Sequence, residues 1–298
     1  MKVLISGASG LVGTELVRQL IEQGHQPIRL VRREAIASDE LEWHPETGSL
    51  DATALTGIDA VVNLAGATTG KIPWTKSYKQ EIVASRLDST RTLVKAIKSA
   101  KNGPKILISG SASGFYGDSG DRFLSEVSPK GTGFLSDLSA EWEAVAKTAP
   151  KSVRVVLVRT TMVLSRKKGA LGRLLPLIRV GLGGPLGSGR QWWAWISVVD
   201  EAAAIIHLIQ TKSAVGAYNL TAPEPATAKD VVVTLAKSLH RPAWFKVPVF
   251  ALRLAFGEAA NELLLCSQKM SADRLLATGF MFTHPTLQSA CDWVVGRE

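Results

Sequence analysis

Three glycines near the start of the chain have the spacing of a turn that holds a diphosphate. Gly7, Gly10 and Gly13 directly follow the apolar residues 3–5 and precede apolar residues at helical spacing. In such a strand, turn and helix, backbone N–H groups approach the phosphates and the helix N-terminus favours negative charge. We predict a dinucleotide site here; an ordinary turn that needs glycine for its conformation alone is the alternative. The residues assigned to this turn are Gly7, Ser9, Gly10, Leu11, Val12 and Gly13.

Two arginines at the end of the second predicted strand indicate which dinucleotide binds. An acidic residue at this place would hold the ribose hydroxyls of NAD, but this chain has Arg32 and Arg33. Guanidinium groups match the geometry of a 2′-phosphate, so we predict that the cofactor is NADP. The alternative is a pair of exposed arginines on a generally basic surface.

Hydroxyl groups after the fourth predicted strand are the candidates for proton transfer and substrate binding. Tyr116, Ser111 and Ser113 lie there and are the predicted catalytic residues. A tyrosine without a cationic neighbour is a poor base near neutral pH. A packed aromatic ring is the alternative for Tyr116, and a role in stabilising the turn is the alternative for both serines.

Strand and helix patterns alternate over the first half of the chain and position these groups. Short apolar runs predict strands at residues 2–6, 27–32, 59–66, 105–109 and 154–159, and amphipathic periodicity predicts helices at residues 77–100 and 136–146. This order predicts an α/β protein with a doubly wound parallel sheet, the Rossmann fold. Ligands of such sheets bind at the carboxyl ends of the strands. The cofactor residues assigned to those ends are Gly66, Ser109, Gly110 and Arg159.

The pattern changes after residue 168. Residues 181–189 form a glycine-rich loop, Trp192, Trp193 and Trp195 follow, and helices are predicted at residues 230–239 and 250–265. We therefore divide the chain into an NADP-binding domain, mainly residues 1–168, and a smaller C-terminal substrate lobe, mainly residues 169–298. The loop is predicted to be a lid or pocket wall. For the tryptophans, core packing is preferred over lining a ligand.

The charge distribution suggests anionic ligands. The chain has a formal net charge of +9, and residues 144–199 contain no acidic side chain. The alternatives are a positive field suited to phosphates and a solvated basic surface. We expect a small polar or phosphorylated substrate, nucleotide-linked or not, and no nucleic-acid partner. The basic residues of this window are Lys151, Arg154, Arg159, Arg166, Lys167, Lys168, Arg173, Arg179 and Arg190.

Other function classes lack support. No apolar run reaches the length of a membrane span, and a predicted strand stands where a signal peptide would be, so we expect a cytoplasmic protein without a membrane partner. Cys266 and Cys291 are too few for a disulfide framework and are expected to be buried thiols. The five histidines have no metal-ligand spacing, so we expect no metal.

Longer motifs resemble a known family. Seven motifs resemble those of the extended short-chain dehydrogenase/reductase superfamily. They are the glycine turn, residues 63–66 (Asn-Leu-Ala-Gly), Ser85-Arg86, residues 111–117, Trp142-Glu143, the loop at residues 181–189 and residues 274–280. Within it, they are most similar to the atypical epimerase-like (YfcH-like) group of the NAD-dependent epimerase/dehydratase superfamily. The resemblance covers essentially the whole chain. One departure is Ser197, where this group more often has a histidine.

The resemblance implies a Rossmann domain that holds NADP and a C-terminal lobe that completes a substrate cleft. It also implies further cofactor contacts. On matching motif positions, these contacts come from Leu64, Ala65, Glu81, Arg86 and Met162.

The catalytic pair typical of the superfamily is missing. Its members use a tyrosine four residues before a lysine, because the ammonium group lowers the phenol pKa. None of the three tyrosines here has a lysine at that spacing. By the resemblance, Leu135 and Ser139 occupy the tyrosine and lysine positions, and Ala112 occupies that of the usual serine or threonine.

Two functions fit the sequence. The first is an NADP-dependent, epimerase-like oxidoreductase with an atypical active site, which exchanges hydride at the nicotinamide ring. The second is a non-catalytic NADP-binding sensor or partner-binding protein, because some relatives in this group are described as cell-division inhibitors.

Overall fold

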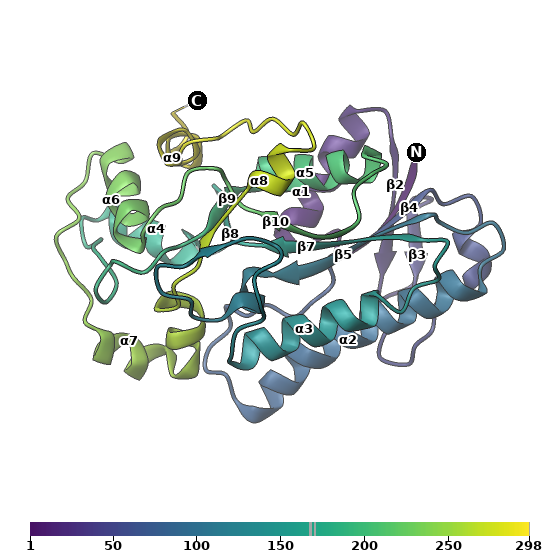
Figure 1. Cartoon of the computed structure of the whole chain (residues 1–298), viewed down its shortest axis with the longest axis horizontal. Coiled ribbons are helices and arrows are strands. Elements are labelled where there is room, and N and C mark those ends of the chain that lie inside the picture. The colour runs from purple at the N-terminus through teal and green to yellow at the C-terminus, as the bar shows by residue number, and fades with distance from the viewer. Residues whose placement is uncertain (167–168, 170, 298) are drawn as a thin grey trace.

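A seven-stranded parallel sheet forms the centre of the computed structural model, which describes residues 1–166, 169 and 171–297. Its order, β3-β2-β1-β4-β5-β7-β10, is that of a doubly wound Rossmann sheet, so the predicted fold is confirmed (Figure 1). The strands are β1 (Lys2–Ser6), β2 (Gln26–Val31), β3 (Glu40–Glu42), β4 (Ala60–Asn63), β5 (Ile106–Ala112), β7 (Arg154–Thr160) and β10 (Gly216–Leu220).

Two pairs of helices cover the two faces of the sheet. α1 (Leu11–Glu22) packs beside α5 (Val198–Gln210) on one face, and α2 (Lys76–Ser99) packs beside α3 (Phe134–Ala146) on the other (Figure 1). Burial on both faces explains why the strands are nearly all apolar, as in Val3, Leu4 and Ile5. The helix predicted at residues 77–100 agrees with α2 to within one residue at each end.

The C-terminal lobe has its own apolar core. Trp193 and Trp195 are both buried in it, which confirms the core packing predicted for two of the three tryptophans. Trp192 is half-buried, and its indole Nε1 donates to Asp121 at 2.9 Å. The lobe contains α4 (Leu171–Arg179), α6 (Ala228–Ser238), α7 (Val249–Phe256), the π-helix Ala260–Leu264 and α9 (Leu287–Val295). The short α8 (Asp273–Leu276) instead packs against β10 of the sheet.

Short elements join the lobe to the sheet domain. Two small parallel ladders pair β6 (Phe123–Leu124) with β11 (Lys269–Met270) and β8 (Met162–Leu164) with β9 (Trp195–Ser197). Single 3-10 turns span Ala52–Leu55 and Ser113–Tyr116. None of the helices in the described part of the chain combines the length and apolar character that a bilayer span needs.

The prediction of one long helix was wrong. The segment predicted as a single helix at residues 250–265 is divided at Gly257, whose φ is +57°. This backbone conformation ends α7, and the π-helix begins three residues later.

The sheet domain is not contiguous in the chain. α5 and β10 both come after residue 168, yet α5 packs on α1 and β10 pairs with β7. The chain therefore enters the C-terminal lobe after β7 and returns with α5 and β10 to complete the sheet and its cover.

Several basic residues of the acid-free window serve the fold. Arg154 donates to the carbonyls of Ile209 and Ala214 at 2.7 and 2.6 Å, at and just beyond the carboxyl end of α5. Arg166 donates to the carbonyl of Trp293 at 2.7 Å. The expectation of phosphate binding by this window therefore fails at these two arginines, while Lys167 and Lys168 lie outside the described residues.

A buried carboxyl group lies where α5 meets β7. Glu201 is fully buried, and its Oε1 accepts a hydrogen bond from Thr160 Oγ1 at 2.6 Å. Its Oε2 has no hydrogen-bond partner among the described residues. Burial raises the pKa of Glu201 to about 8, so the side chain is protonated at neutral pH.

This carboxyl group makes stability depend on pH. In the unfolded chain Glu201 ionises near its ordinary pKa of 4.5, whereas in the folded protein it ionises near 8. Between these two pH values the unfolded state therefore binds fewer protons than the folded state. The free energy of unfolding consequently falls as pH rises through this range. Glu201→Gln removes this effect. The quantity to compare is the free energy of unfolding of the variant minus that of wild type. We expect this difference to be more favourable to the variant at pH 8 than at pH 4.5 by on the order of a few kcal/mol.

Urea denaturation at both pH values measures this difference. Glu141→Gln on the exposed face of α3 is the matched control and should show the same small change at each pH. A Glu201→Gln effect that does not vary with pH would contradict the assignment of a buried, protonated carboxyl group.

Candidate active site

The glycine turn fits tightly against a neighbouring strand end. Gly7 has φ +71°, and a Cβ placed on it would lie 2.6 Å from the carbonyl oxygen of Leu64. A Cβ on Gly13 would lie 2.2 Å from the carbonyl oxygen of Gly7. Both contacts are far below van der Waals separation, so only glycine fits at these two positions. The turn consequently brings the N-terminus of α1 directly against the carboxyl ends of β1 and β4.

The N-terminus of α1 is open to an anion. Gly10 is the N-cap and supplies no side-chain cap, and the first turn of α1 has no acidic residue. Ser9 and Gly10 are exposed. Unsatisfied N–H groups and the helix dipole favour a phosphate at such a position. The exposed turn and the uncapped helix therefore fit a diphosphate.

A buried polar network fixes the strand ends around the turn. Ser6 Oγ donates to Asn63 Oδ1 at 2.6 Å, and Asn63 Nδ2 donates to Thr90 Oγ1 at 2.9 Å. The indole of Trp142 donates to the same Thr90 oxygen at 2.9 Å. The network ties β1 and β4 to α2 and α3. It thereby holds the half-buried Leu64 and Ala65 beside the glycine turn.

Arg86 is a partly buried cation beside that turn. Its Nη1 donates to the carbonyls of Ala67 and Ile82, both at 3.1 Å, and its guanidinium group lies over the ring of Trp142. No carboxylate among the described residues forms an ion pair with it. Burial lowers the pKa of Arg86 to about 10. A desolvated cation without an acidic partner favours a nearby anion.

The structure separates the roles of the two predicted phosphate-binding arginines. Arg33 forms a bidentate pair with Glu40, with Nη1–Oε2 and Nη2–Oε1 distances of 2.9 and 2.8 Å. The Arg33 guanidinium lowers the pKa of Glu40 to about 2. Arg32 is exposed at the end of β2, and its side chain bonds to no other described residue. Arg32 is therefore the guanidinium that is available to an external phosphate.

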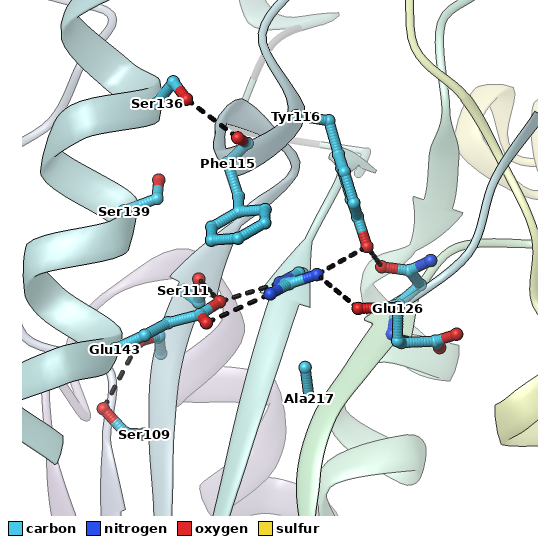
Figure 2. Close-up of polar contacts among 12 residues, drawn as sticks. Ser109, Ser111, Phe115, Tyr116, Glu126, Ser136, Ser139, Glu143 and Ala217 are labelled. Carbon is cyan, nitrogen blue, oxygen red and sulfur yellow. Dashed lines mark hydrogen bonds and ion pairs between the residues drawn. The ribbon is translucent and has the colours of Figure 1, made fainter. Parts of the chain in front are cut away.

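Arg159 points into the protein, not toward a cofactor. Its guanidinium binds the carboxylate of Glu143 through Nε and Nη2 at 2.7 and 3.1 Å, and Nη1 donates to Tyr116 Oη at 2.8 Å (Figure 2). It also lies 3.6 Å from the ring centre of Phe115. Arg159 and Glu143 are both almost completely buried. The prediction that Arg159 binds the cofactor is corrected, because this internal network uses its donors.

The same network binds two predicted catalytic hydroxyl groups. Ser111 Oγ donates to Glu143 Oε1 at 2.8 Å, and Tyr116 Oη donates to Asn219 Oδ1 at 2.7 Å (Figure 2). Tyr116 is 1% exposed, and burial raises its pKa above the ordinary value although Arg159 acts in the opposite direction. Neither hydroxyl faces solvent. The catalytic assignments of Ser111 and Tyr116 are therefore corrected to structural ones, and a packed aromatic ring describes Tyr116.

The neighbouring strand residues are also interior. Ser109 is fully buried, and its hydroxyl donates to the carbonyl of Gly110 at 3.3 Å. A Cβ on Gly110 would lie 2.7 Å from the ring of Trp142, so this glycine makes room for an indole and not for a cofactor. Ser113 differs from these residues: it begins a 3-10 turn, is partly exposed and has no side-chain hydrogen bond to another described residue.

Apolar packing occupies the predicted tyrosine position. Leu135 lies in the first turn of α3 and packs in a cluster with Trp74, Tyr78, Phe134 and, from the C-terminal lobe, Leu263. Ser139 donates its hydroxyl to the carbonyl of Leu135 at 2.7 Å. Leu135 and Ser139, which the resemblance places at the superfamily's tyrosine and lysine positions, thus contribute to packing and helix bonding in this chain.

A carboxylate from the distant π-helix caps α3 at the same place. Glu262 accepts hydrogen bonds from the backbone N–H groups of Phe134 and Leu135 at 3.3 and 3.2 Å. A Cβ on Gly133 would lie 2.5 Å from Glu262 Oε1. A carboxylate at a helix N-terminus satisfies free donors and complements the dipole. Sequence reasoning missed Glu262 because it lies more than 120 residues from the helix it caps.

The remaining predicted residues differ in exposure. Gly66 is exposed beside Arg86, Met162 is half-buried in β8, and Glu81 is exposed on α2. The departure at Ser197 is structural: its hydroxyl caps α5 and lies 3.0 Å from Nδ1 of the buried His284. Among the described residues, no cluster of three or more His, Cys, Asp or Glu side chains could hold a metal.

These features define a class of protein. The sheet order, the glycine turn and the open helix beside it are those of a Rossmann protein of the extended short-chain dehydrogenase/reductase type. The chain belongs to the NAD dependent epimerase/dehydratase family, whose model matches residues 3–221. A second model, for a domain of unknown function, matches residues 247–294.

Individual relatives cover the chain from end to end. It is 41% identical to an epimerase family protein of Mycobacterium bovis, over 99% of this chain and 98% of that protein. It is 36% identical to the human epimerase family protein SDR39U1, over 99% and 100%. A crystal structure of human SDR39U1 with NADPH has a TM-score of 0.93 at 33% identity, covering 99% of each chain. A nucleoside-diphosphate sugar epimerase from Corynebacterium glutamicum has a TM-score of 0.83 at 30% identity, covering all of this chain and 59% of that one.

The Glu143–Arg159 pair should contribute strongly to stability. Glu143→Ala leaves the buried Arg159 without a counterion, so we expect the free energy of unfolding to fall by about 3–5 kcal/mol. Asp88→Ala, which breaks the exposed pair with Arg91, is the control and should cost less than about 1 kcal/mol. Urea denaturation of both variants measures the difference. Equal losses would show that the buried pair does not organise this edge of the sheet.

Proposed function

We propose that the protein is an NADP(H)-dependent, epimerase-like oxidoreductase. The glycine turn, the uncapped N-terminus of α1 and the exposed Arg32 together support NADP binding. The crystal structure of human SDR39U1 with NADPH supports it independently. When bound, the cofactor supplies a hydride donor or acceptor at its nicotinamide ring.

Arg32 carries the proposed preference for NADP over NAD. The 2′-phosphate of NADP would sit at the end of β2, where Arg32 supplies a planar set of donors. Arg33 contributes less, because Glu40 already accepts from both terminal nitrogens of its guanidinium group. Arg86 would stabilise negative charge on the other side of the glycine turn, near Gly66.

We propose a small polar substrate, phosphorylated or nucleotide-linked. This class is supported by the similarity to the nucleoside-diphosphate sugar epimerase from Corynebacterium glutamicum. Ser113 is the hydroxyl proposed to orient the substrate, since Ser111 and Tyr116 serve the buried network. The apolar cluster around Leu135 excludes water from the position where the superfamily's tyrosine would act.

The cofactor assignment predicts a specific loss of affinity. Arg32→Ala should weaken NADPH binding by roughly tenfold to a hundredfold, because one charge-assisted phosphate contact is lost, and should leave NADH affinity unchanged. Isothermal titration calorimetry of both cofactors measures the two Kd values.

Two variants serve as controls for this experiment. Arg33→Ala should show a smaller loss of NADPH affinity than Arg32→Ala, and Arg91→Ala, an exposed arginine on α2, should show none. If wild type binds NADPH and NADH equally well, or if Arg32→Ala changes neither affinity, the preference for NADP is wrong.

The catalytic assignment makes a separate prediction. On a substrate that supports NADPH oxidation in a panel of nucleotide-linked and phosphorylated sugars, Ser113→Ala should lower kcat/KM by about tenfold to a hundredfold without changing the Kd for NADPH. Ser99→Ala at the exposed end of α2 is the control. Deuterium transfer from stereospecifically labelled NADPH confirms the chemistry. Tight NADPH binding without turnover on any substrate would overturn the enzymatic part and leave cofactor binding intact.

A further inference from the structure

The C-terminal lobe exposes a group of large apolar side chains that its own core does not cover. They lie in two segments, one at the end of α4 and one in the loop before α7 and in α7 itself. Trp244 is 85% exposed and Leu254 87% exposed, far more than ordinary surface packing leaves open. The group, here called the lobe patch, consists of Leu177, Val180, Leu182, Trp244, Phe245, Phe250 and Leu254.

Backbone contacts show that the two segments are adjacent. The N–H of Phe245 donates to the carbonyl of Gly183 at 3.3 Å, and Leu186 and Val247 form a parallel β-bridge. A Cβ on Gly184 would lie 2.1 Å from the carbonyl oxygen of Phe245. The glycines of this loop therefore allow the end of α4 and the loop before α7 to lie side by side. The lobe patch is built from both segments.

Helix geometry places two apolar residues on the outer face of α7. Phe250 and Leu254 are four residues apart, so they lie on one side of the helix, and both are exposed. Leu252, on the opposite side, is buried in the core of the lobe. α7 consequently presents apolar residues both to the protein and to its surroundings.

Within the two segments that build the lobe patch, every charged side chain is positive. The exposed Glu258 lies two residues after the end of α7 and pairs with Lys79 at 2.8 Å. Residues 174–190 and 231–257 contain no aspartate or glutamate. Arg179, Arg241, Lys246 and Arg253 lie within these segments and are exposed. The surface thus combines exposed aromatic and aliphatic side chains with basic ones and has no acidic residue in the segments that build it.

We propose that the lobe patch binds the surface of an anionic lipid bilayer, with its apolar side chains inserted among the headgroups. Aromatic and aliphatic residues beside lysine and arginine are the combination that such interfaces favour. Trp244 matches the preference of tryptophan for the membrane–water boundary. The association is peripheral and sets aside the expectation, drawn from the sequence, that the protein has no membrane partner.

Charge argues against a second copy of the chain as the occupant. A symmetric dimer through this face would bring Arg179, Arg241, Lys246 and Arg253 of each copy toward those of the other, without an acidic residue from these segments to neutralise them. An anionic lipid surface neutralises all four. The lobe patch also lies at the opposite end of the molecule from β2 and β3, near which Arg32 lies (Figure 1). Membrane binding would therefore leave the proposed cofactor site accessible.

Vesicle sedimentation with the full-length protein tests the proposal. Vesicles of phosphatidylcholine with about one third phosphatidylserine should sediment the protein, and vesicles of phosphatidylcholine alone should sediment much less. Trp244→Ser combined with Leu254→Ser keeps the charge and removes two of the most exposed apolar side chains. This double variant should lower partitioning by about tenfold or more. The matched control is Ile36→Ser, since Ile36 is 81% exposed near β3.

A second pair of variants separates specific from general electrostatic attraction. Lys246→Glu with Arg253→Glu should reduce binding far more than Lys95→Glu with Lys98→Glu on α2, although both pairs change the net charge equally. Unchanged thermal unfolding would show that the variants are folded. The proposal is overturned if anionic vesicles do not sediment wild type, if the apolar double variant binds as wild type does, or if the two charge pairs behave alike. Recruitment by an acidic protein without vesicle binding would also overturn it.

Discussion

The buried ion pair between Arg159 and Glu143 organises the carboxyl edge of the sheet. A guanidinium group and a carboxylate that are both removed from water persist only when each is neutralised and its hydrogen bonds are satisfied. Here the pair joins β7 to α3, and Tyr116 extends it to Asn219 on β10. Asn219 Nδ2 in turn lies 3.3 Å from the carbonyl oxygen of Ser271 in the C-terminal region. The Arg159–Glu143 pair thus connects the sheet, through Tyr116 and Asn219, to the C-terminal segment that contains Ser271.

This coupling determines which groups remain for chemistry. Because Glu143 accepts from Ser111, and Arg159 and Asn219 bind Tyr116, these hydroxyls are structural. The first turn of α3 is apolar on one side and capped by Glu262 on the other. Ser113 is left as the partly exposed candidate hydroxyl at the end of β5. At Leu135, where the resemblance places the superfamily's tyrosine, this chain has apolar packing between the two lobes.

Local patterns could be predicted from the sequence, and partners far along the chain could not. The glycine turn was correctly placed because strand, turn and helix are adjacent and each glycine has a fixed steric reason. α2 was predicted to within one residue from its periodicity. By contrast, the pair between Arg159 and Glu143 depends on tertiary packing, and so does the cap from Glu262. Even the pair between Arg33 and Glu40, only seven residues apart, requires knowing how β2 and β3 align.

The basic excess is divided between internal and exposed positions. The sequence placed a positive field in residues 144–199, but within that window Arg154 binds backbone carbonyls and Arg159 binds Glu143. Arg179, in the same window, is exposed at the lobe patch. A cation whose donors are used inside the protein is not available to a ligand. The cations still available to bind partners are exposed ones, such as Arg32 at the end of β2 and those around the lobe patch. Since these two regions lie at opposite ends of the molecule, the protein can present one basic surface to a cofactor phosphate and another to an anionic interface without competition between them.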